Sequence, residues 1–472
     1  MNVNLFLIIL TISLLSGCSG SDRKGSSLPP TMPGDEYSGA SFELTAATIT
    51  YDTRIDSLIF SLDVEDDAAS VVPVAAGSVD GAPVLAYVFT TSLSPATVGF
   101  GDVQGTLALA VTSHPDFDDT PFWDEDNNAV FDDDGVVYHS HWVVLESNDL
   151  AGEGLAVVQA RKDSTLPPTA PMPMYLDSPG FDVIENDNTL KVIVPFNRVK
   201  RDRTFTATAL TAYLEVEAQE SGPLLKVEQI YSTLSADGEQ SLIVDNVSNA
   251  ADNALPGLST DELPGTFAIN EASVDYFDDL QSHVFSMTTD SNIAASMPVG
   301  IGQVDGAPVF GYVFPTDLTP SAVGFKDIDG ILALALTSHP DFDDTPLWDE
   351  DMDDDYANDG KIYHTHWVVL VDDASSAAGL SVPSQPDTTK LPPTAPMPMY
   401  LDSPGFHAFA QDQSLYIVVP KQRINNITQF NFDAVTAKMN VDASSGTPVL
   451  RVNEVLSIWS NDLSLPGTVT LR

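Results

Sequence analysis

The feature that most constrains the fold of this chain is an internal duplication. When the sequence is aligned with itself at a shift of 225 residues, the separation of His114 from His339, most of the stretch 42–225 finds a counterpart. The segment LPPTAPMPMYLDSPGF occurs unchanged at 166–181 and 391–406. This period is far longer than the roughly 20–50 residues of solenoid repeats. The chain therefore contains two tandem copies of one domain-sized unit.

Within each copy, short segments rich in valine, leucine, threonine and aromatic residues are separated by glycine, proline, asparagine and aspartate, a pattern typical of β-strands and turns. Examples are 106–111, 136–145, 190–195 and 204–216. No long segment shows a convincing helical period. We therefore predict an all-β protein with two tandem homologous antiparallel β-sandwich-like or barrel-like domains.

Composition divides the rest of the chain. Residues 19–40 are rich in serine, glycine and proline, and 236–265 is polar with two Pro-Gly pairs. Both patterns are typical of loops and linkers. The predicted organisation is a signal peptide at 1–18, a flexible tether at 19–40, the first repeat at 41–235, a linker at 236–265 and the second repeat at 266–472.

The N-terminus has an apolar run from Leu5 to Leu15, which is too short for a membrane span and fits the core of a signal peptide. The run ends in Leu-Ser-Gly before Cys18, and this segment resembles the lipobox of bacterial lipoproteins. The resemblance implies cleavage before Cys18, lipidation of that residue and anchoring in the cell envelope. Ser19 in the next position favours the outer membrane. A plain secretory signal is the alternative, because no Lys or Arg precedes the apolar run.

The charge balance is strongly acidic, with 68 Asp and Glu against 19 Lys and Arg and a formal net charge of −49. Such a surface repels phosphate backbones and anionic lipid headgroups. We therefore expect no nucleic acid partner and no polybasic membrane contact. Metal cations are the expected partners; the alternative is that the acidity serves solubility alone.

Six of the eight histidines form two triplets at matching positions of the repeats: His114, His139 and His141, and His339, His364 and His366. In a strand, the two histidines of the HSH or HTH segment project from one face, about 6.5–7 Å apart at their Cα atoms. Two imidazoles at that spacing can reach one ion, and a neighbouring strand can supply the third nitrogen. Three histidines with an open position suit zinc, copper or iron.

Carboxylates crowd the segment between the histidines of each triplet. Because they have few basic neighbours, they repel one another, and a hard cation such as calcium relieves the repulsion. The predicted calcium or accessory ligands are Asp116, Asp124 and Asp126 in the first repeat and Asp341, Asp349, Asp351 and Asp353 in the second. The alternative is a solvated acidic loop, since the EF-hand pattern is incomplete. Asp116 or Asp341 can instead complete or orient the histidine site.

Other patterns that share these residues are partial. The HSHW and HTHW segments resemble the metal strand of α-type carbonic anhydrases, but there the third histidine follows the pair. A cupin-like His-x-His-x4-Glu element with Glu146 is lost in the second repeat, where Val371 stands. His114 and Asp116, followed by His139, resemble the facial triad of non-haem iron oxygenases, but the distal histidine comes too early for that family. The duplicated Pro-Met-Pro-Met segment offers thioethers to copper, although such methionines usually fill core gaps.

Motifs for nucleophilic, phosphate-loop and haem chemistry are absent from the sequence. The leading functional hypothesis is a cell-envelope lipoprotein whose two metal-binding β domains serve metal capture or surface binding. One rival is a zinc-dependent hydrolase or lyase that uses a metal-bound water. Another is a calcium-stabilised structural or adhesive module in which the histidines do not converge.

Overall fold

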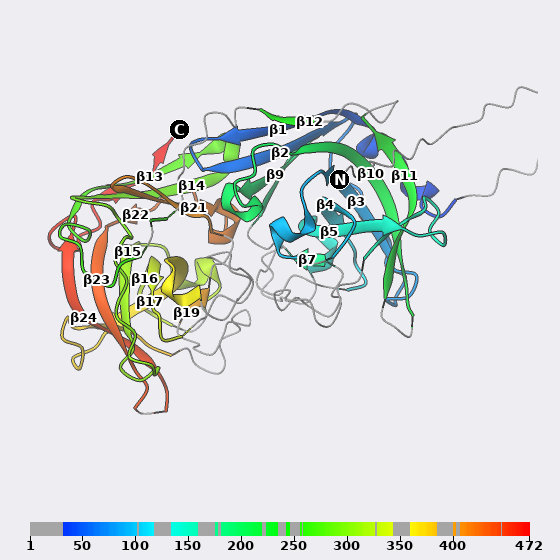
Figure 1. Cartoon of the computed structure of the whole chain (residues 1–472). Helices are drawn as coiled ribbons and strands as arrows, with labels where there is room; N and C mark the ends of the chain where they lie inside the picture. The colour runs from blue at the N-terminus through cyan, green and yellow to red at the C-terminus, as the bar shows by residue number, and fades with distance from the viewer. Residues whose placement is uncertain are drawn as a thin grey trace, which may run out of the picture.

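The computed structural model describes residues 32–101, 103–117, 134–158, 175–177, 181–219, 223–234, 242–245, 255–256, 258–325, 328–342, 359–384, 400–402, 406–444 and 446–472. Regular structure in these residues consists of β-strands and short 3-10 helices, without an α-helix, so the all-β prediction is confirmed (Figure 1). In this part of the chain no helix is long and apolar enough to cross a bilayer. The predicted signal peptide, with Cys18, lies outside the described residues.

The first repeat is built around a closed antiparallel barrel of six strands. Strand β3 pairs with β4, and the order continues through β5, β6, β11 and β10 back to β3. A second sheet of β1, β2, β9 and β8 lies beside it, and β12 joins β1 to β10. The strands are β1 Leu44–Asp52, β2 Ser57–Val64, β3 Pro83–Thr91, β4 Thr106–Ser113, β5 His139–Ser147, β6 Leu155–Val157, β7 Tyr175–Asp177, β8 Asp182–Asn186, β9 Thr189–Pro195, β10 Thr206–Glu217, β11 Leu224–Thr233 and β12 Leu242–Asp245.

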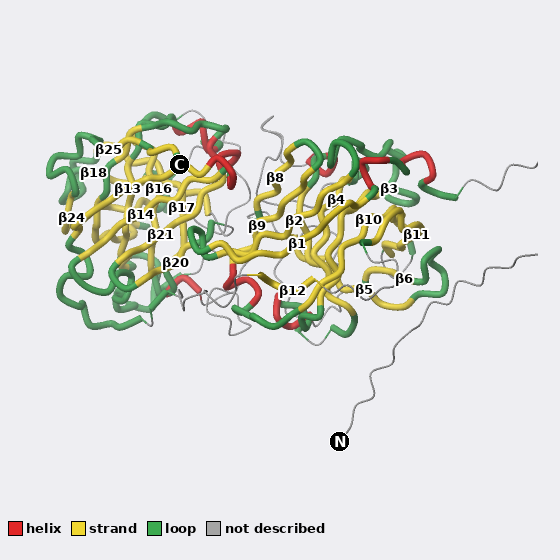
Figure 2. The backbone as a smooth tube through the Cα atoms, turned by 90° about the horizontal axis from the view of Figure 1, so that it is seen from above, coloured by secondary structure: helices red, strands yellow, loops and turns green. Residues whose placement is uncertain are grey.

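The second repeat has the same architecture, which confirms tandem barrel-like domains. Its barrel runs β15, β16, β17, β18, β24, β23 and back to β15. Its strands are β13 Ile269–Phe277, β14 Ser282–Thr289, β15 Pro308–Pro315, β16 Ile331–Ser338, β17 His364–Asp372, β18 Leu380–Val382, β19 Tyr400–Asp402, β20 Ala408–Gln411, β21 Ser414–Pro420, β22 Asn431–Phe432, β23 Val435–Asp442, β24 Val449–Ile458, β25 Gly467–Thr468 and β26 Thr470–Leu471. Figure 2 shows the two repeats side by side.

Short 3-10 helices precede or connect these strands: η1 Asp35–Tyr37, η2 Ala40–Phe42, η3 Pro95–Val98, η4 Asp134–Val136, η5 Phe196–Val199, η7 Asp278–Leu280, η8 Pro320–Val323, η9 Asp359–Lys361 and η10 Lys421–Ile424. Two of them, η4 and η9, directly precede the strands that carry paired histidines, β5 and β17. They therefore belong to the surroundings of the histidine groups.

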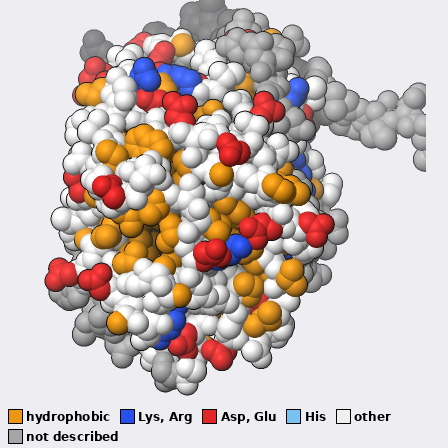
Figure 3. Space-filling view, turned by 90° about the vertical axis from the view of Figure 1, so that its left-hand side faces the viewer, with side chains coloured by type: hydrophobic (Ala, Val, Ile, Leu, Met, Phe, Trp, Pro, Cys, Tyr) orange, Lys and Arg blue, Asp and Glu red, His pale blue; other side chains and the backbone are white. Residues whose placement is uncertain are grey.

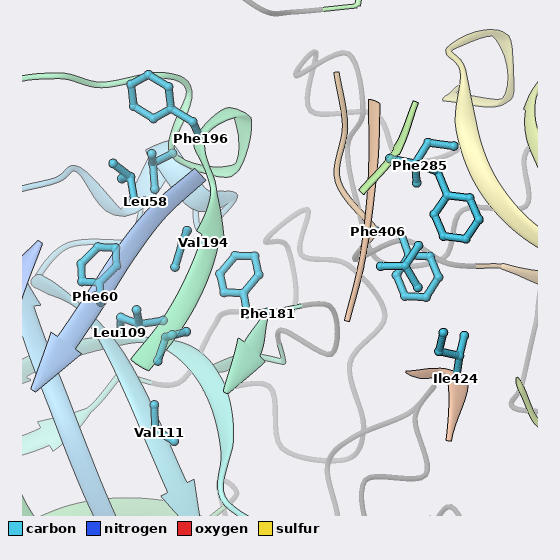
Figure 4. Packing of buried hydrophobic residues seen from close by; sticks show 14 of the residues in the cluster. Leu58, Phe60, Leu109, Val111, Phe181, Val194, Phe196, Phe285, Phe406 and Ile424 are labelled. Carbon is cyan, nitrogen blue, oxygen red and sulfur yellow. The ribbon is translucent and has the colours of Figure 1, made fainter. Parts of the chain in front are cut away.

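Strand β4 explains why some barrel strands are apolar on both faces. Its residues Leu107, Leu109 and Val111 pack in the core between the barrel and the second sheet. The alternate residues Ala108 and Ala110 pack in the barrel lumen. Both faces of the strand are therefore buried, which removes the polar alternation expected of a half-exposed strand. Figure 4 shows Leu109 near Phe60 of β2, another member of this core.

One strand lies beyond the boundary that composition predicts for the first repeat. Strand β12, inside the predicted linker 236–265, pairs in parallel with β1, where Thr50 faces Asp245. In the second repeat, β26 pairs in the same way with β13, where Asp275 faces Thr470. Both pairs are related by the 225-residue shift, so the first repeat includes at least residues up to Asp245.

The repeats contact each other through a small hydrophobic cluster to which both contribute matching positions. The first repeat supplies Ile55, Ile59, Ile184 and Ile193, and the second supplies Leu280, Val284, Phe409 and Val418. Each member of the first set lies 225 positions before a member of the second. Use of the same patch by both partners is characteristic of two-fold dimers. The chain therefore forms a covalent pseudo-dimer.

One buried carboxylate connects the repeats beside this cluster. Asp56, fully buried, accepts hydrogen bonds from the Tyr51 hydroxyl at 2.6 Å, the Arg201 guanidinium at 2.6 Å and His407 Nε2 of the other repeat at 3.1 Å. Burial alone would raise the pKa of Asp56, but His407 and Arg201 outweigh it and hold that pKa at about 2. Burial lowers the pKa of His407, so the imidazole is neutral at pH 7 and still donates.

Candidate metal centres

The three histidines of each repeat come together inside the barrel. On β5, His139 and His141 share a face with Val143 and Leu145, which belong to the lumen cluster. The intervening Trp142 packs on the opposite side, in the core shared with the second sheet. His114 follows β4, the strand whose Thr112 faces His139. All three imidazoles are therefore directed into the lumen, and each is at most 4% exposed.

The geometry of the group is compact and almost identical in the two repeats. In each triplet, one ligand atom from every histidine lies within 4.8 Å of the other two. Ring centroids of His139 and His141 are 4.6 Å apart, and those of His364 and His366 are also 4.6 Å apart. Two buried three-histidine groups that can hold a metal ion are thus present.

Backbone carbonyls orient two imidazoles of each group. His114 Nδ1 lies 2.9 Å from the Phe117 carbonyl oxygen, and His139 Nδ1 lies 2.7 Å from that of Val137. We assign the proton to Nδ1 in both rings because a carbonyl only accepts. The Nε2 lone pairs then face each other at 3.1 Å. The second repeat repeats the arrangement, with His339 and His364 Nε2 atoms 3.0 Å apart.

Two unprotonated nitrogens at this distance need a positive charge between them, either a shared proton or a metal ion. Two imidazole nitrogens bound tetrahedrally to zinc at ~2.0–2.1 Å lie ~3.3–3.4 Å apart. The observed separations of 3.1 and 3.0 Å are close to that value. Carbonyl contacts at the other ring nitrogen are also the usual outer partners of metal-bound histidines. The donor set therefore fits a transition metal.

Gly135, in η4, allows the close approach that orients His114. A Cβ atom at this position would lie 2.1 Å from the Phe117 carbonyl oxygen and 2.8 Å from His114 Nδ1. The Gly135 carbonyl accepts the backbone N–H of His114 at 2.6 Å. Gly360 is placed in the same way against Phe342 and His339. A side chain at either position would displace a histidine or its carbonyl acceptor.

We expect Gly135→Ala to weaken metal binding in the first repeat about 10–100-fold, the usual cost of disturbing a partner outside the ligand set. The second repeat should keep its affinity. Calorimetric titration with zinc measures the affinities of both repeats. Gly39→Ala is the control, because Gly39 has extended backbone and nothing within 4 Å of an added Cβ. Equal affinities in both variants would show that Gly135 does not position His114.

The predicted carboxylate ligands that the structure describes do not belong to the histidine groups. Asp116 is not a member of the histidine group, and its two carboxylate oxygens accept the backbone N–H groups of Ala76 and Gly77 at 2.9 and 2.6 Å. Asp341 accepts those of Ile301 and Gly302 at 3.0 and 2.5 Å. These two residues thus stabilise a loop next to the barrel. The other predicted acidic ligands lie outside the described residues: Asp124, Asp126, Asp349, Asp351 and Asp353.

Several residues of the site were not predicted, although the duplication marks them. Phe117 stacks on His114 with ring centroids 4.4 Å apart, and Phe342 stacks on His339 at 4.2 Å. The Ser113 hydroxyl donates to the Val136 carbonyl at 2.6 Å and so connects the end of β4 to η4. Ser113, Phe117 and Gly135 all recur 225 positions later. Comparing the repeats around the histidines, rather than the histidines alone, would have found them.

A cavity of about 240 Å³ lies between the repeats beside the first histidine group. His139, Tyr138 and Glu185 of the first repeat line it, with Gln281 and Gln422 of the second. The residue Glu185 is exposed to solvent, but the surrounding protein raises the pKa of its carboxyl group by desolvation. The first histidine group is therefore bordered by a polar cavity that includes residues of both repeats.

Comparisons with known proteins do not assign the chain to a family. No family model matches it, and no curated protein matches it. A structure of a 1.5-MDa bacterial ice-binding adhesin, studied for host cell surface retention, aligns over 91% of this chain and 99% of its own, with 10% identity and a TM-score of 0.11. A Ca2+-stabilized adhesin that helps an Antarctic bacterium bind ice aligns over 88% and 100%, with 10% identity and a TM-score of 0.07. At these scores the likeness carries no argument, and the functional inference depends on the two histidine groups.

Proposed function

We propose that each repeat binds one transition-metal ion, zinc, copper or iron, through its three histidines. The ligands would be His114, His139 and His141 in the first repeat and His339, His364 and His366 in the second. The observation that supports this most strongly is the pair of Nε2 atoms at 3.1 and 3.0 Å in the two repeats, with each Nδ1 at a backbone carbonyl. The metal would supply the positive charge that these nitrogens require.

The burial of the histidines supports metal binding rather than a chance cluster of imidazoles. All six histidines are at most 4% exposed, so a metal ion held between them would be shielded from water. Because the rings are already oriented, little reorganisation accompanies metal uptake. Three protein ligands leave one position for water or another ligand.

The wider role that we propose is metal capture or surface binding by a lipoprotein of the cell envelope, anchored through Cys18 and exposed from the outer membrane. The lipobox-like segment and the net charge of −49 support this role. Calcium would bind the acidic segments between the histidines. A cation there would relieve repulsion between their carboxylates and order the connection that leads to the paired histidines.

A second candidate function is supported by the cavity of about 240 Å³ beside His139. In a zinc-dependent hydrolase or lyase, the metal lowers the pKa of its bound water, and a carboxylate with a raised pKa takes up a proton. Glu185, which lines this cavity, has such a pKa. The second repeat has Ala410 at the matching position, so this chemistry would belong to the first repeat.

The test of the binding function is calorimetric titration of metal-free protein with zinc in the presence of excess calcium. We expect uptake of two equivalents, because calcium prefers oxygen ligands and does not compete for imidazole. Zinc uptake that calcium abolishes would place the ions on carboxylates and contradict the proposal. A parallel ester-hydrolysis assay with Glu185→Gln as control distinguishes the catalytic candidate from simple binding.

A further inference from the structure

The lumen of the second barrel contains an apolar cavity of about 80 Å³ that the metal-binding proposal does not use. Residues from all six barrel strands line it, and Thr337 is the one polar side chain among the described lining residues. A void of this kind stays free of water, because a water molecule needs two to four polar partners. The cavity therefore suits an apolar occupant.

A glycine beside the cavity makes room for Met439, one of its lining residues. Gly311 lies inside β15, where glycine weakens a strand, and its backbone is not in the left-handed region. A Cβ on Gly311 would lie 2.7 Å from the terminal methyl carbon of Met439, which lines the cavity. The first repeat has Ala86 and Leu214 at the matching positions. The second barrel thus combines a glycine with a flexible methionine, a side chain that adapts to differently shaped occupants.

The rim of the cavity is apolar and partly open. Ile331 at the start of β16 lines the cavity and is 39% exposed. Leu463 and Leu465, beyond β24, complete the lining and are half-buried. Hydrophobic side chains also gather in the middle of the molecular face shown in Figure 3. An exposed apolar rim next to an apolar lumen fits a chain that inserts one end and keeps the other in water.

The cavity lies next to the histidine group. Its lining residues Ala335 and Thr337 are the register partners of His366 and His364, and directly opposed residues have neighbouring side chains. An occupant would therefore extend from the rim toward the histidines. Its affinity for the apolar walls does not require a metal, so this inference is independent of the proposed function.

We propose that the second barrel binds the alkyl chain of a small neutral amphiphile, with the polar head at the rim near Ile331. An uncharged head is favoured because the described lining offers no charged partner, and because a net charge of −49 repels anions. Each methylene that enters an apolar site strengthens binding about fourfold, until the chain fills the space. A dependence on chain length followed by a plateau is the signature of such a site.

The test is titration of the full-length chain with 1-alkanols from 1-butanol to 1-octanol, monitored by NMR of methionine methyl groups. The Met439 signal is assigned by its loss in Met439→Leu. We expect saturable shifts of this signal, with affinity that rises about fourfold per methylene before it levels off. Shifts that do not saturate, or an affinity without dependence on chain length, would overturn the proposal.

Ala437→Leu, which adds bulk to the lining, should reduce the affinity at least tenfold. Its matched control is Ala212→Leu at the corresponding position of the first barrel, which should leave the Met439 response unchanged. Undiminished binding in Ala437→Leu would contradict the site. If that variant does not fold, the alkanol series on the unmodified chain decides the question alone.

Discussion

Replacement of both His139 and His141 by alanine should remove one of two bound metal ions and weaken zinc binding in the first repeat by at least about 100-fold. The expected loss exceeds the 10–100-fold cost of disturbing an outer partner, because two of three ligands are deleted. Competition with a chelator of known affinity measures it.

The matched control is the same change at His364 and His366, since the two groups share their distances within about 0.1 Å. This second double variant should lose the metal ion of the second repeat and keep the ion of the first repeat. If either double variant kept two ions with unchanged affinity, the histidines would not be the ligands. Loss of both ions in one variant would instead mean that the repeats do not bind independently.

Asp56→Asn should destabilise the protein by about 3–5 kcal/mol, the usual cost of removing one partner of a buried ion pair. The variant leaves the guanidinium of Arg201, whose side chain is 14% exposed, without its carboxylate. It also removes the carboxylate that accepts the hydrogen bond from His407, a residue of the other repeat. Urea unfolding monitored by tryptophan fluorescence measures the change.

Asp279→Asn is the control, because Asp279 pairs with Arg54 across the same interface but its side chain is 58% exposed. Exposed pairs contribute at most about 1 kcal/mol. Similar losses in the two variants would contradict a special role for Asp56.

The pH dependence of stability gives a second readout. The folded-state pKa of Asp56, about 2, is below the ordinary aspartate value of 3.8. Its contribution is therefore present above pH 3.8 and is lost as the pH falls from 3.8 toward 2, an effect of about 2 kcal/mol. Asp56→Asn should lack this part of the acid transition. An acid transition identical to that of the unmodified chain would contradict the assignment.

The sequence was sufficient for the fold class and for the tandem organisation, because strand composition and the 225-residue shift are local or pairwise signals. It did not distinguish sandwich from barrel. That choice depends on whether β6, a strand of three residues without a signature of its own, pairs with the distant strand β11. Strand β12 was missed for a similar reason: four residues in a polar segment become a strand because β1 offers a free edge.

The histidine groups could be predicted because strand alternation places His139 and His141 on one face. The contacts of Asp116 and Asp341 could not. A crowded set of carboxylates is compatible with a cation, but Asp116 instead satisfies two loop N–H groups. The contact between the repeats was also missed, since Ile55, Ile59, Ile184 and Ile193 look like ordinary core residues in the sequence. Their role becomes apparent when the matching residues of the second repeat are found opposite them.

The most direct test of the central claim is elemental analysis by plasma mass spectrometry of mature protein purified without chelator or affinity tag. A variant with alanine at His139, His141, His364 and His366 is analysed in parallel. We predict about two equivalents of zinc, copper or iron per chain, all absent from the variant. Calcium alone, or a transition-metal content that the four substitutions leave unchanged, would contradict the claim that the two histidine groups are metal centres.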